Sequence, residues 1–509
     1  MTRLLTAAAA AGICVLAMPV AAQKSADTLR VGFIDPIATI EVAIDPKPET
    51  IMTTYAVFDG LVWYDPRARE YRPALAESWT RIGDRTVEFK LKRGIKFHDG
   101  SEFTADDVVY TYQWLTDPNS KLRFVPLEFV ERTEKIDDYT VRVIEKRPTA
   151  WDLARFDTAI YPAAIHSKLA DKSEFGRKAP IGTGPYKVES VDSTKGIVLT
   201  RHEGYQLAQP WRPAGGAKRI VILPIPEMQT QVAQLMTGGL DLIHDVPKDL
   251  AEPLGANPAL ALTATPGPNY FFMSIDSAKR TPNVALANPN VRKALQMASD
   301  RNLLAKTVVT GGDQVVVVNS LCVPQQADCP TELDAYPPTP DQAAARRLLS
   351  EAGYPNGLDV DITSYPGAFE IAEAVAGELR KIGVRASVAK LTLGAYRDKQ
   401  AKNLQEILVG HFWSPAASPN GSFESFFADT PRNYTRDPKM WDFYLQAAQA
   451  LDQKNRITVF RQAFSYLNAN YYIMPLTNFP TVLAHTKDVV VGTGAMNPAG
   501  IDLNRITWK

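Results

Sequence analysis

Catalytic and metal-binding residue types are scarce in this sequence. Its 509 residues include only three cysteines and six histidines, and no two histidines stand at the close spacing that places two ligands on one helix face. A phosphate-binding Gly-x-x-x-x-Gly-Lys loop, a Gly-x-Ser-x-Gly elbow and a His-Glu-x-x-His motif are also missing. We therefore expect no metal and no cofactor, and the common sites of nucleotidases, hydrolases and metalloproteases have no support.

An excess of one charge is absent as well. Lysine and arginine total 56, aspartate and glutamate total 56, and the formal net charge is zero. Nucleic-acid-binding proteins normally carry a basic excess that neutralises phosphates. We expect no nucleic-acid partner, while a small charged ligand stays open.

Long apolar runs are missing except near the N-terminus. Residues 4–22 carry no charge and end in small residues at Ala22, which predicts a signal peptide over residues 1–22, cleaved after Ala22. A lipid-anchored cysteine is disfavoured because the bulky Ile13 precedes Cys14. We expect a soluble mature protein that is exported to the periplasm.

The other two cysteines, Cys322 and Cys329, lie in the segment SLCVPQQADCP. An oxidising compartment favours a disulfide between them that closes a small loop. A pair of unpaired buried thiols is the alternative, and it is less favoured because Pro324 and Pro330 indicate an irregular loop. A zinc site is poorer still, because no histidine or second cysteine pair is nearby.

The length favours at least two lobes, because 509 residues exceed what one hydrophobic core usually serves. Apolar patterns predict strands at 28–34 and 86–92, an antiparallel meander over about 62–147, and a buried strand at 219–226. From residue 269 onward, strands alternate with helices at 290–309 and 340–353, and residues 369–391 have the pattern of a helix, a turn and a strand. This alternation predicts a second α/β lobe with largely parallel strands. Two α/β lobes of similar size commonly hold a ligand between them.

The stretch KLKRGIKFHDGSEFTADDVVYTY, residues 90–112, has the sequence pattern of a strand, a turn and a helix. Asp99-Gly100 is a turn signal, and Thr104 with Asp107 resembles a capping box at the start of a helix. His98 has no nucleophile or second base in this motif, so we interpret it as a structural side chain and not as a general base.

Several segments carry a family resemblance. Residues 74–112 resemble the signature region of the family 5 extracellular solute-binding proteins, the dipeptide- and oligopeptide-binding group of ABC importers. PIGTGPYKVES, QLMTGGLDLIHDV, NPNVRKALQMASDRNLL and AARRLLSEAGYPNG resemble further landmarks of that family, in the right order along nearly the whole mature chain.

The resemblance implies an α/β fold of the periplasmic-binding-protein "Venus flytrap" type II, in three parts. Lobe I would take residues 23–268 and 472–509, with an inserted domain Ib at about 62–178, and lobe II would take residues 269–471. It implies a monomer that is not an enzyme, that captures a small organic solute by hinge closure and that delivers the solute to a membrane permease. The hinge would lie near 264–270 and 470–477.

In peptide-binding relatives, an acid in lobe II holds the ligand's ammonium group. The matching segment here, LVGHFWSPAASPNGSFESFF, contains no acid between His411 and Phe423, which puts a free peptide N-terminus in doubt as the anchor. Alternation along a strand also predicts that Tyr270 and Phe271 do not both line the cleft. The family positions give these candidate ligand-binding residues, each with packing as the alternative: Asn269, Tyr270, Phe271, Tyr365, His411, Phe412, Trp413, Ser414, Asn420, Thr477, Asn478 and Phe479.

Two other functions have some support in the sequence. Some family relatives bind nickel chelates or haem, and His411 could touch such a cargo, although a single histidine is usually a hydrogen-bonding side chain. Ser387-Val388-Ala389-Lys390 matches a Ser-x-x-Lys spacing, but it lies in an alternating strand pattern and lacks its partner motifs. An exported serine hydrolase is therefore a poor alternative.

Overall fold

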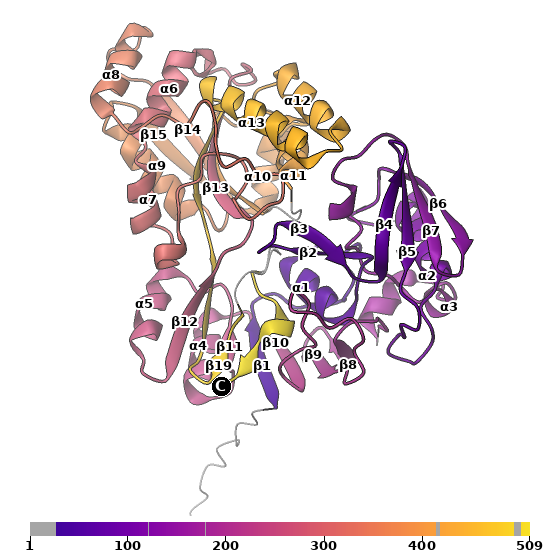
Figure 1. The fold of residues 1–509 in the computed structure, drawn as a ribbon. Coiled ribbons are helices and arrows are strands. Elements are labelled where there is room, and N and C mark those ends of the chain that lie inside the picture. The colour runs from indigo at the N-terminus through magenta and orange to yellow at the C-terminus, as the bar shows by residue number, and fades with distance from the viewer. Residues whose placement is uncertain (1–26, 121, 179, 414–417, 493–499) are drawn as a thin grey trace, which may run out of the picture.

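The computed structural model describes residues 27–120, 122–178, 180–413, 418–492 and 500–509. Three larger sheets organise these residues, with seven, five and four strands. We call the part built on the seven- and four-stranded sheets lobe I, and the part built on the five-stranded sheet lobe II (Figure 1). Within the described residues, no helix is long and apolar enough to cross a membrane. The expected signal peptide, residues 1–22, lies outside them.

The seven-stranded sheet has the order β12-β18-β11-β1-β10-β9-β8. Its centre is parallel, because β1 pairs with β10 and β11 in that sense, and its outer pairs are antiparallel. Helices α1, α4 and α5 lie in the segments that connect strands of this sheet. The elements are β1 (Thr28–Phe33), α1 (Pro48–Val57), β8 (Tyr186–Asp192), β9 (Gly196–Arg201), β10 (Arg219–Pro224), α4 (Met228–Thr237), β11 (Leu242–Ile243), α5 (Lys248–Ala256), β12 (Leu260–Thr265) and β18 (Thr481–Thr486).

The four-stranded sheet is antiparallel in the order β4-β5-β7-β6, as the alternating pattern predicts. It shares one hydrophobic core with the seven-stranded sheet, in which Val31 of β1 and Phe89 of β5 are both fully buried. Its neighbours are a short hairpin and α2. The elements are β2 (Val62–Asp65), β3 (Glu70–Pro73), β4 (Ala76–Ile82), β5 (Thr86–Leu91), α2 (Ala105–Thr116), β6 (Val130–Asp137), β7 (Thr140–Glu145) and α3 (Ala163–His166), with 3-10 turns at Pro118–Ser120, Asp152–Ala154 and Lys172–Arg177.

The predicted capping box of α2 is present. The Thr104 hydroxyl accepts from the Asp106 backbone N–H at 3.3 Å, and the Asp107 carboxylate accepts from the Thr104 backbone N–H at 2.9 Å. His98 lies beside the turn that precedes this helix. Its Nδ1 accepts from the Gly182 N–H at 3.2 Å, so its Nε2 carries the proton that reaches the Gly184 carbonyl oxygen at 2.9 Å. These bonds to the backbone agree with the structural role expected for His98.

The five-stranded sheet of lobe II has the order β15-β14-β16-β13-β17. We expected largely parallel strands, and only β15, β14 and β16 are parallel; β13 is antiparallel to both β16 and β17. The reason is that β13 enters this lobe and β17 leaves it, so neither belongs to a strand-helix-strand unit. The strands are β13 (Asn269–Ile275), β14 (Asp359–Ser364), β15 (Arg385–Lys390), β16 (Ile407–Trp413) and β17 (Ile473–Asn478).

Helices surround this sheet. The single helix predicted over 290–309 is two helices, because Asp300 caps a new one by accepting from the Leu303 N–H at 3.1 Å. The helices are α6 (Pro289–Ala298), α7 (Arg301–Thr307), α8 (Gln342–Glu351), α9 (Phe369–Arg380), α10 (Leu393–Ala401), α11 (Asn420–Phe427), α12 (Pro438–Gln449) and α13 (Gln453–Ala469), with 3-10 turns at Val284–Ala287 and Gly312–Gln314.

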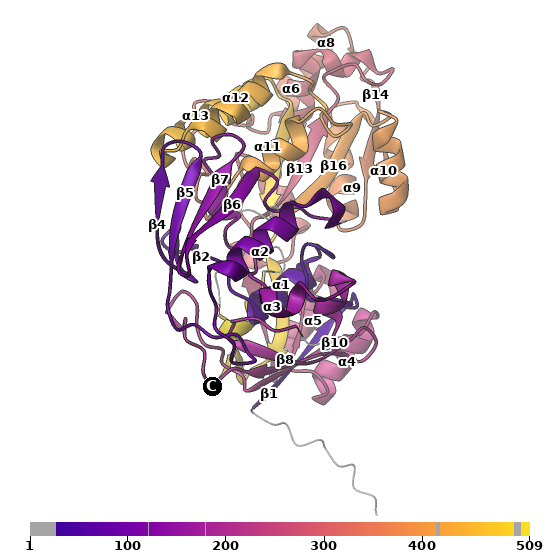
Figure 2. The ribbon, with the colours of Figure 1, turned by 90° about the vertical axis from the view of Figure 1, so that its right-hand side faces the viewer.

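The chain crosses between the lobes twice. One crossing joins Thr265 at the end of β12 to Asn269 at the start of β13, and the other joins Asn478 of β17 to Thr481 of β18. β17 pairs with β13 in the lobe II sheet up to Asn478. The chain ends with β19 (Val489–Val490), a 3-10 turn at Leu503–Arg505 and β20 (Thr507–Trp508). Figure 2 shows α12 and α13 above the end of the four-stranded sheet, where the lobes meet away from the crossings.

Candidate functional site

Strand register decides which of the predicted ligand-binding residues share a face. Antiparallel pairing of β13 and β16 sets Phe271 opposite His411 and Tyr270 opposite Phe412. Tyr270 is fully buried, and its hydroxyl lies 2.8 Å from the Ser422 hydroxyl. Because neighbouring residues of a strand point to opposite faces, Tyr270 and Phe271 pack into different cores.

Five of the predicted residues come together at one end of the lobe II sheet. We call Phe271, Tyr365, His411, Trp413 and Phe479 the aromatic cluster. The His411 ring lies 5.0 Å from the ring of Tyr365, 5.2 Å from that of Trp413 and 5.6 Å from that of Phe479, centroid to centroid. Trp413 is 42% exposed, whereas the other members are buried or partly buried. An exposed tryptophan at the rim of an aromatic cluster is suited to stack on a solute.

His411 is held in this cluster by Tyr365. The Tyr365 hydroxyl donates to the His411 carbonyl oxygen at 2.5 Å and accepts from the His411 backbone N–H at 3.1 Å. Burial, and to a smaller degree the positive charge of Arg432, lower the pKa of the His411 imidazole to about 4. The ring is therefore neutral near pH 7 and offers stacking and one hydrogen bond, not a charge.

The remaining predicted residues are mostly in packing positions. Thr477 donates to the Val316 carbonyl oxygen at 2.9 Å, and Asn478 bonds the backbone of Val316 and Gln314. Asn420 begins α11, is fully buried, and neither its amide oxygen nor its nitrogen has a partner in the described part of the chain. Asn269 is buried in β13, Phe412 is buried under the sheet, and Ser414 lies outside the described residues.

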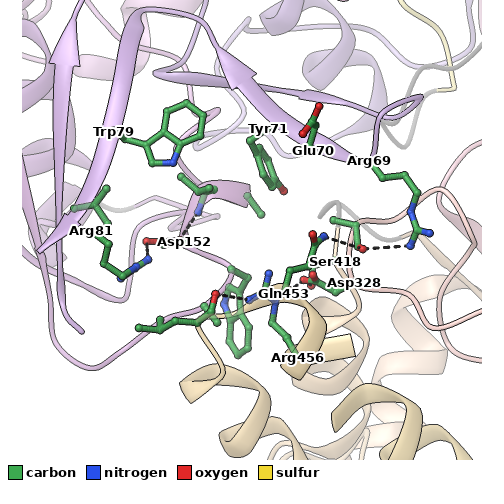
Figure 3. A pocket seen from close by; sticks show the side chains of 17 residues that line it. Arg69, Glu70, Tyr71, Trp79, Arg81, Asp152, Asp328, Ser418, Gln453 and Arg456 are labelled. Carbon is green, nitrogen blue, oxygen red and sulfur yellow. Dashed lines mark hydrogen bonds and ion pairs between the residues drawn. The ribbon is translucent and has the colours of Figure 1, made fainter. Parts of the chain in front are cut away.

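A separate pocket of about 450 Å³ lies between the lobes (Figure 3). Lobe I supplies residues of the β2–β3 hairpin, β4, β5 and the turn at 150–154, and lobe II supplies residues near the disulfide and around the start of α13. None of the eleven predicted residues that the structure describes lines it. The lining residues are Arg69, Glu70, Tyr71, Trp79, Arg81, Val87, Ala150, Trp151, Asp152, Leu153, Ala154, Ala327, Asp328, Ser418, Leu451, Gln453 and Arg456.

Direct contacts between the lobes surround this pocket. The Cys322–Cys329 disulfide, with a Cα separation of 5.8 Å, closes the loop that lobe I touches, and we call residues 322–329 the disulfide loop. Arg69 donates from Nη2 to the carbonyl oxygens of residues 326, 327 and 329 at 2.8–3.2 Å. On the other side of the pocket, the Ala150 N–H donates to the Ala448 carbonyl oxygen at 2.9 Å, and Trp151 lies 5.0 Å from the Tyr444 ring.

On the lobe I wall of the pocket, the positive charge of one arginine is balanced by one neighbouring carboxylate. Arg81 forms an ion pair with Asp152, and its Nη1 lies 3.5 Å from Oε1 of Glu145. Burial, reinforced by Asp152, raises the pKa of Glu145 to about 9, so this carboxyl is protonated near pH 7. One carboxylate and one guanidinium thus balance each other on this wall.

Sequence reasoning missed the pocket residues because no local pattern joins them. Asp328 lies 2.9 Å from Arg456 and accepts from the Ser418 hydroxyl at 2.8 Å, although about 90 or more positions separate it from either partner. The one available signal was the cysteine pair, which marks the ordered loop that carries Asp328. Among the described residues, no group of three or more His, Cys, Asp or Glu side chains is arranged for a metal ion.

Comparisons with known proteins agree with this architecture. A family model described as "Bacterial extracellular solute-binding proteins, family 5 Middle" matches residues 70–434. The chain is 28% identical to the glutathione-binding protein GsiB of Pectobacterium atrosepticum, over 81% of this chain and 78% of that protein. It is 30% identical to heme-binding protein A of Haemophilus influenzae, over 73% of this chain and 71% of that protein.

The fold is also that of a solved relative. The structure of HbpA2 from Haemophilus parasuis superposes with a TM-score of 0.80 at 24% identity, covering 95% of this chain and all of that one. Such a superposition over nearly the whole length establishes the two-lobed α/β fold of type II periplasmic binding proteins. Because the family model matches more than half of this chain, the chain belongs to family 5 of the bacterial extracellular solute-binding proteins.

Proposed function

We propose that this protein is the periplasmic solute-binding component of an ABC importer. In this role it captures one small organic solute between its lobes and presents the closed form to a permease. Family membership supports the transport role. The observation that carries the proposal is the pocket of about 450 Å³ whose walls come from both lobes, because a solute held by both walls favours the closed form.

The two chain crossings support a hinge as the moving part. The segments 266–268 and 479–480 are short, and the contacts of Arg69 and Ala150 with lobe II lie on the other side of the molecule. Rotation about the crossings opens those contacts with little change inside either lobe. We propose lobe boundaries close to residues 268 and 478, and a monomer as the working unit.

We infer the solute class from two groups of side chains, the aromatic cluster and the lining of the interlobe pocket. The aromatic cluster offers ring faces and a neutral imidazole, and the pocket offers paired charges. Such surfaces suit a polar organic solute with an apolar or aromatic part. The glutathione-binding and heme-binding relatives and a Helicobacter pylori homologue solved with a peptide bound lie within this range.

Haem or a nickel chelate is the second candidate, and one relative was solved with Ni(L-His). His411 is the residue that favours it, because its imidazole is neutral and can ligate a metal held by the cargo. Hydrolysis has less support, because Ser387 and Lys390 lie within the extended strand β15 and not at a helix N-terminus. We propose that the protein is not an enzyme.

A thermal-shift screen of residues 23–509 tests this function. The panel contains peptides, glutathione derivatives, sugars, aromatic acids, haem and nickel chelates. A solute that binds only the folded protein raises the melting temperature in a concentration-dependent way. The expected result is a stabilising hit from one solute class, and turnover of a chromogenic ester without any binding hit would contradict the proposal.

A further inference from the structure

The interlobe pocket contains a buried carboxylate of which only one oxygen accepts a hydrogen bond from the described residues. Asp328 is 2% exposed and lines the pocket. Its Oδ2 accepts from the Ser418 hydroxyl and lies 2.9 Å from Nε of Arg456. Its Oδ1 is buried and has no hydrogen-bond partner among the residues that the structure describes. Leaving a buried carboxylate oxygen unpaired is unfavourable, so a missing donor at this position is a sign of a ligand.

A second orphan atom faces the same space. Tyr71 lines the pocket, and its hydroxyl is buried with no partner in the described residues. Figure 3 shows this hydroxyl pointing toward the part of the pocket where Asp328 and Ser418 lie. Burial, with smaller contributions from Asp157 and Asp328, raises the pKa of Tyr71, so the phenol keeps its proton and can donate or accept.

Two guanidinium groups, those of Arg69 and Arg456, line the same pocket as Asp328. Arg456 donates from Nη1 to the carbonyl oxygens of residues 450 and 451. Its Nε lies 2.9 Å from Asp328 Oδ2 and is buried without a hydrogen-bond partner among the described residues. Arg69 uses Nη2 on the disulfide loop, and it forms no ion pair with a described carboxylate. Donors for an anionic group therefore lie beside an acceptor for a cationic group.

We propose that this pocket binds the zwitterionic head group of an α-amino acid, with its ammonium on Asp328 Oδ1 and its carboxylate on Arg456 and Arg69. The tyrosine hydroxyl of Tyr71 completes the ammonium site. Asp328, delivered by the disulfide loop, then supplies the acid that the segment between His411 and Phe423 lacks. This inference rests on the proposed solute-binding function and names the solute class: molecules with a free amino-acid end, such as γ-glutamyl peptides.

The test is a set of matched titrations by calorimetry. The probe is S-methylglutathione, which carries a free α-amino-acid end and has no thiol to exchange with the disulfide. Its N-acetyl derivative removes the ammonium, and its α-carboxamide removes the carboxylate. We expect each analogue to bind the wild-type protein at least about tenfold more weakly, since each leaves buried charged groups unpaired.

The variants assign the effect to the pocket. Asp328→Asn should lower the affinity for S-methylglutathione at least about tenfold and leave the affinity for the N-acetyl derivative unchanged. The variant should then bind the two compounds equally well. Asp359→Asn is the matched control, because it makes the same substitution at an exposed carboxylate that pairs with Arg385 outside the pocket, and it should bind both probes as the wild type does. Should Asp328→Asn fail to fold, Tyr71→Phe replaces it. The Tyr71 hydroxyl has no partner among the described residues, so its removal should change the stability of the fold little, and a severalfold loss of affinity for S-methylglutathione is expected.

The outcomes separate this inference from the proposed function. If Asp328→Asn still distinguishes the acetylated from the free amine as the wild type does, the ammonium site is overturned. If the carboxamide binds as tightly as the acid, the guanidinium site is overturned. Stabilisation by haem, a nickel chelate or a sugar, with none from any amino-acid end, overturns the pocket assignment and keeps the transport function. No binding by any solute class overturns both.

Discussion

The phenolic oxygen of Tyr64 lies 2.7 Å from the carbonyl oxygen of Gln325, although 261 positions separate the two residues in the chain. This bond joins the β2–β3 hairpin of lobe I to the disulfide loop of lobe II. Burial raises the pKa of Tyr64, so the hydroxyl keeps its proton and acts as the donor. The contact belongs to the same lobe interface as those of Arg69.

Removing this hydroxyl should favour the open form. We expect Tyr64→Phe to weaken solute binding about two- to tenfold, because a neutral hydrogen bond contributes about 0.5–1.5 kcal/mol. Small-angle scattering should show a larger radius of gyration for the variant at a subsaturating solute concentration. Tyr466→Phe is the matched control, since its hydroxyl bonds Asp437 within lobe II. Equal effects of the two substitutions would contradict a role in closure.

The disulfide should contribute to both stability and affinity. Replacing Cys322 and Cys329 together by alanine frees a loop of short span, and the expected loss in unfolding free energy is about 2–3 kcal/mol. Solute affinity should fall as well, because the loop presents the carbonyl oxygens that Arg69 binds. Urea unfolding and calorimetry measure the two effects. A reducing agent should lower the stability and the solute affinity of the wild type and change neither quantity in the double variant. A change in the double variant would show that the reducing agent acts at a place other than this disulfide.

Acidification should destabilise the protein through His98. Burial lowers the pKa of its imidazole to about 4, and the unfolded chain keeps an ordinary value of about 6.5. The unfolded state therefore binds the proton more readily, so the stabilisation is present above about pH 6.5 and is lost as the pH falls toward 4. At pH 5 the expected loss from this residue is about 2 kcal/mol.

Urea unfolding at pH 7 and pH 5 checks this expectation. His98→Asn should be less stable than the wild type at pH 7, because the Gly182 and Gly184 backbone bonds are disturbed. The difference between the two pH values should shrink in the variant by about 2 kcal/mol. An undiminished pH dependence would show that other groups carry it. Solute binding should survive at pH 7, which separates a structural role from one in recognition.

Trp413 should matter for binding and little for folding. Its side chain is 42% exposed at the rim of the aromatic cluster, so Trp413→Ala creates little cavity. We expect an unfolding free energy within about 1 kcal/mol of the wild type and an affinity at least about fivefold lower. Tryptophan fluorescence during titration should also lose part of its change. A large fall in stability with unchanged affinity would return Trp413 to a packing role.

Local patterns in the sequence were sufficient for much of the fold. Alternation predicted a strand over residues 86–92, which the structure has at Thr86–Leu91. Side-chain chemistry predicted the capping box of Thr104 and Asp107. Both features depend on neighbours within a few positions. The helix over 290–309 was predicted as one element because a capping aspartate inside an amphipathic run looks like a surface residue. The prediction of largely parallel strands in lobe II was wrong for β13 and β17. Their antiparallel pairing joins segments about 200 positions apart, which no local pattern reveals.

What the sequence by itself determined is the class of protein: its neutral charge, its ordered family motifs and its cysteine pair led to a two-lobed solute-binding protein. Register along β13 and β16 then followed once the strands were paired. Only the tertiary structure decided the interlobe pocket, because Arg69, Asp328 and Arg456 come from three distant segments. Their sequence neighbours carry no shared pattern, since the side chains meet through the docking of one lobe on the other. The recognition that we propose depends on such contacts, and these are set by the packing of the lobes and not by any local run of residues.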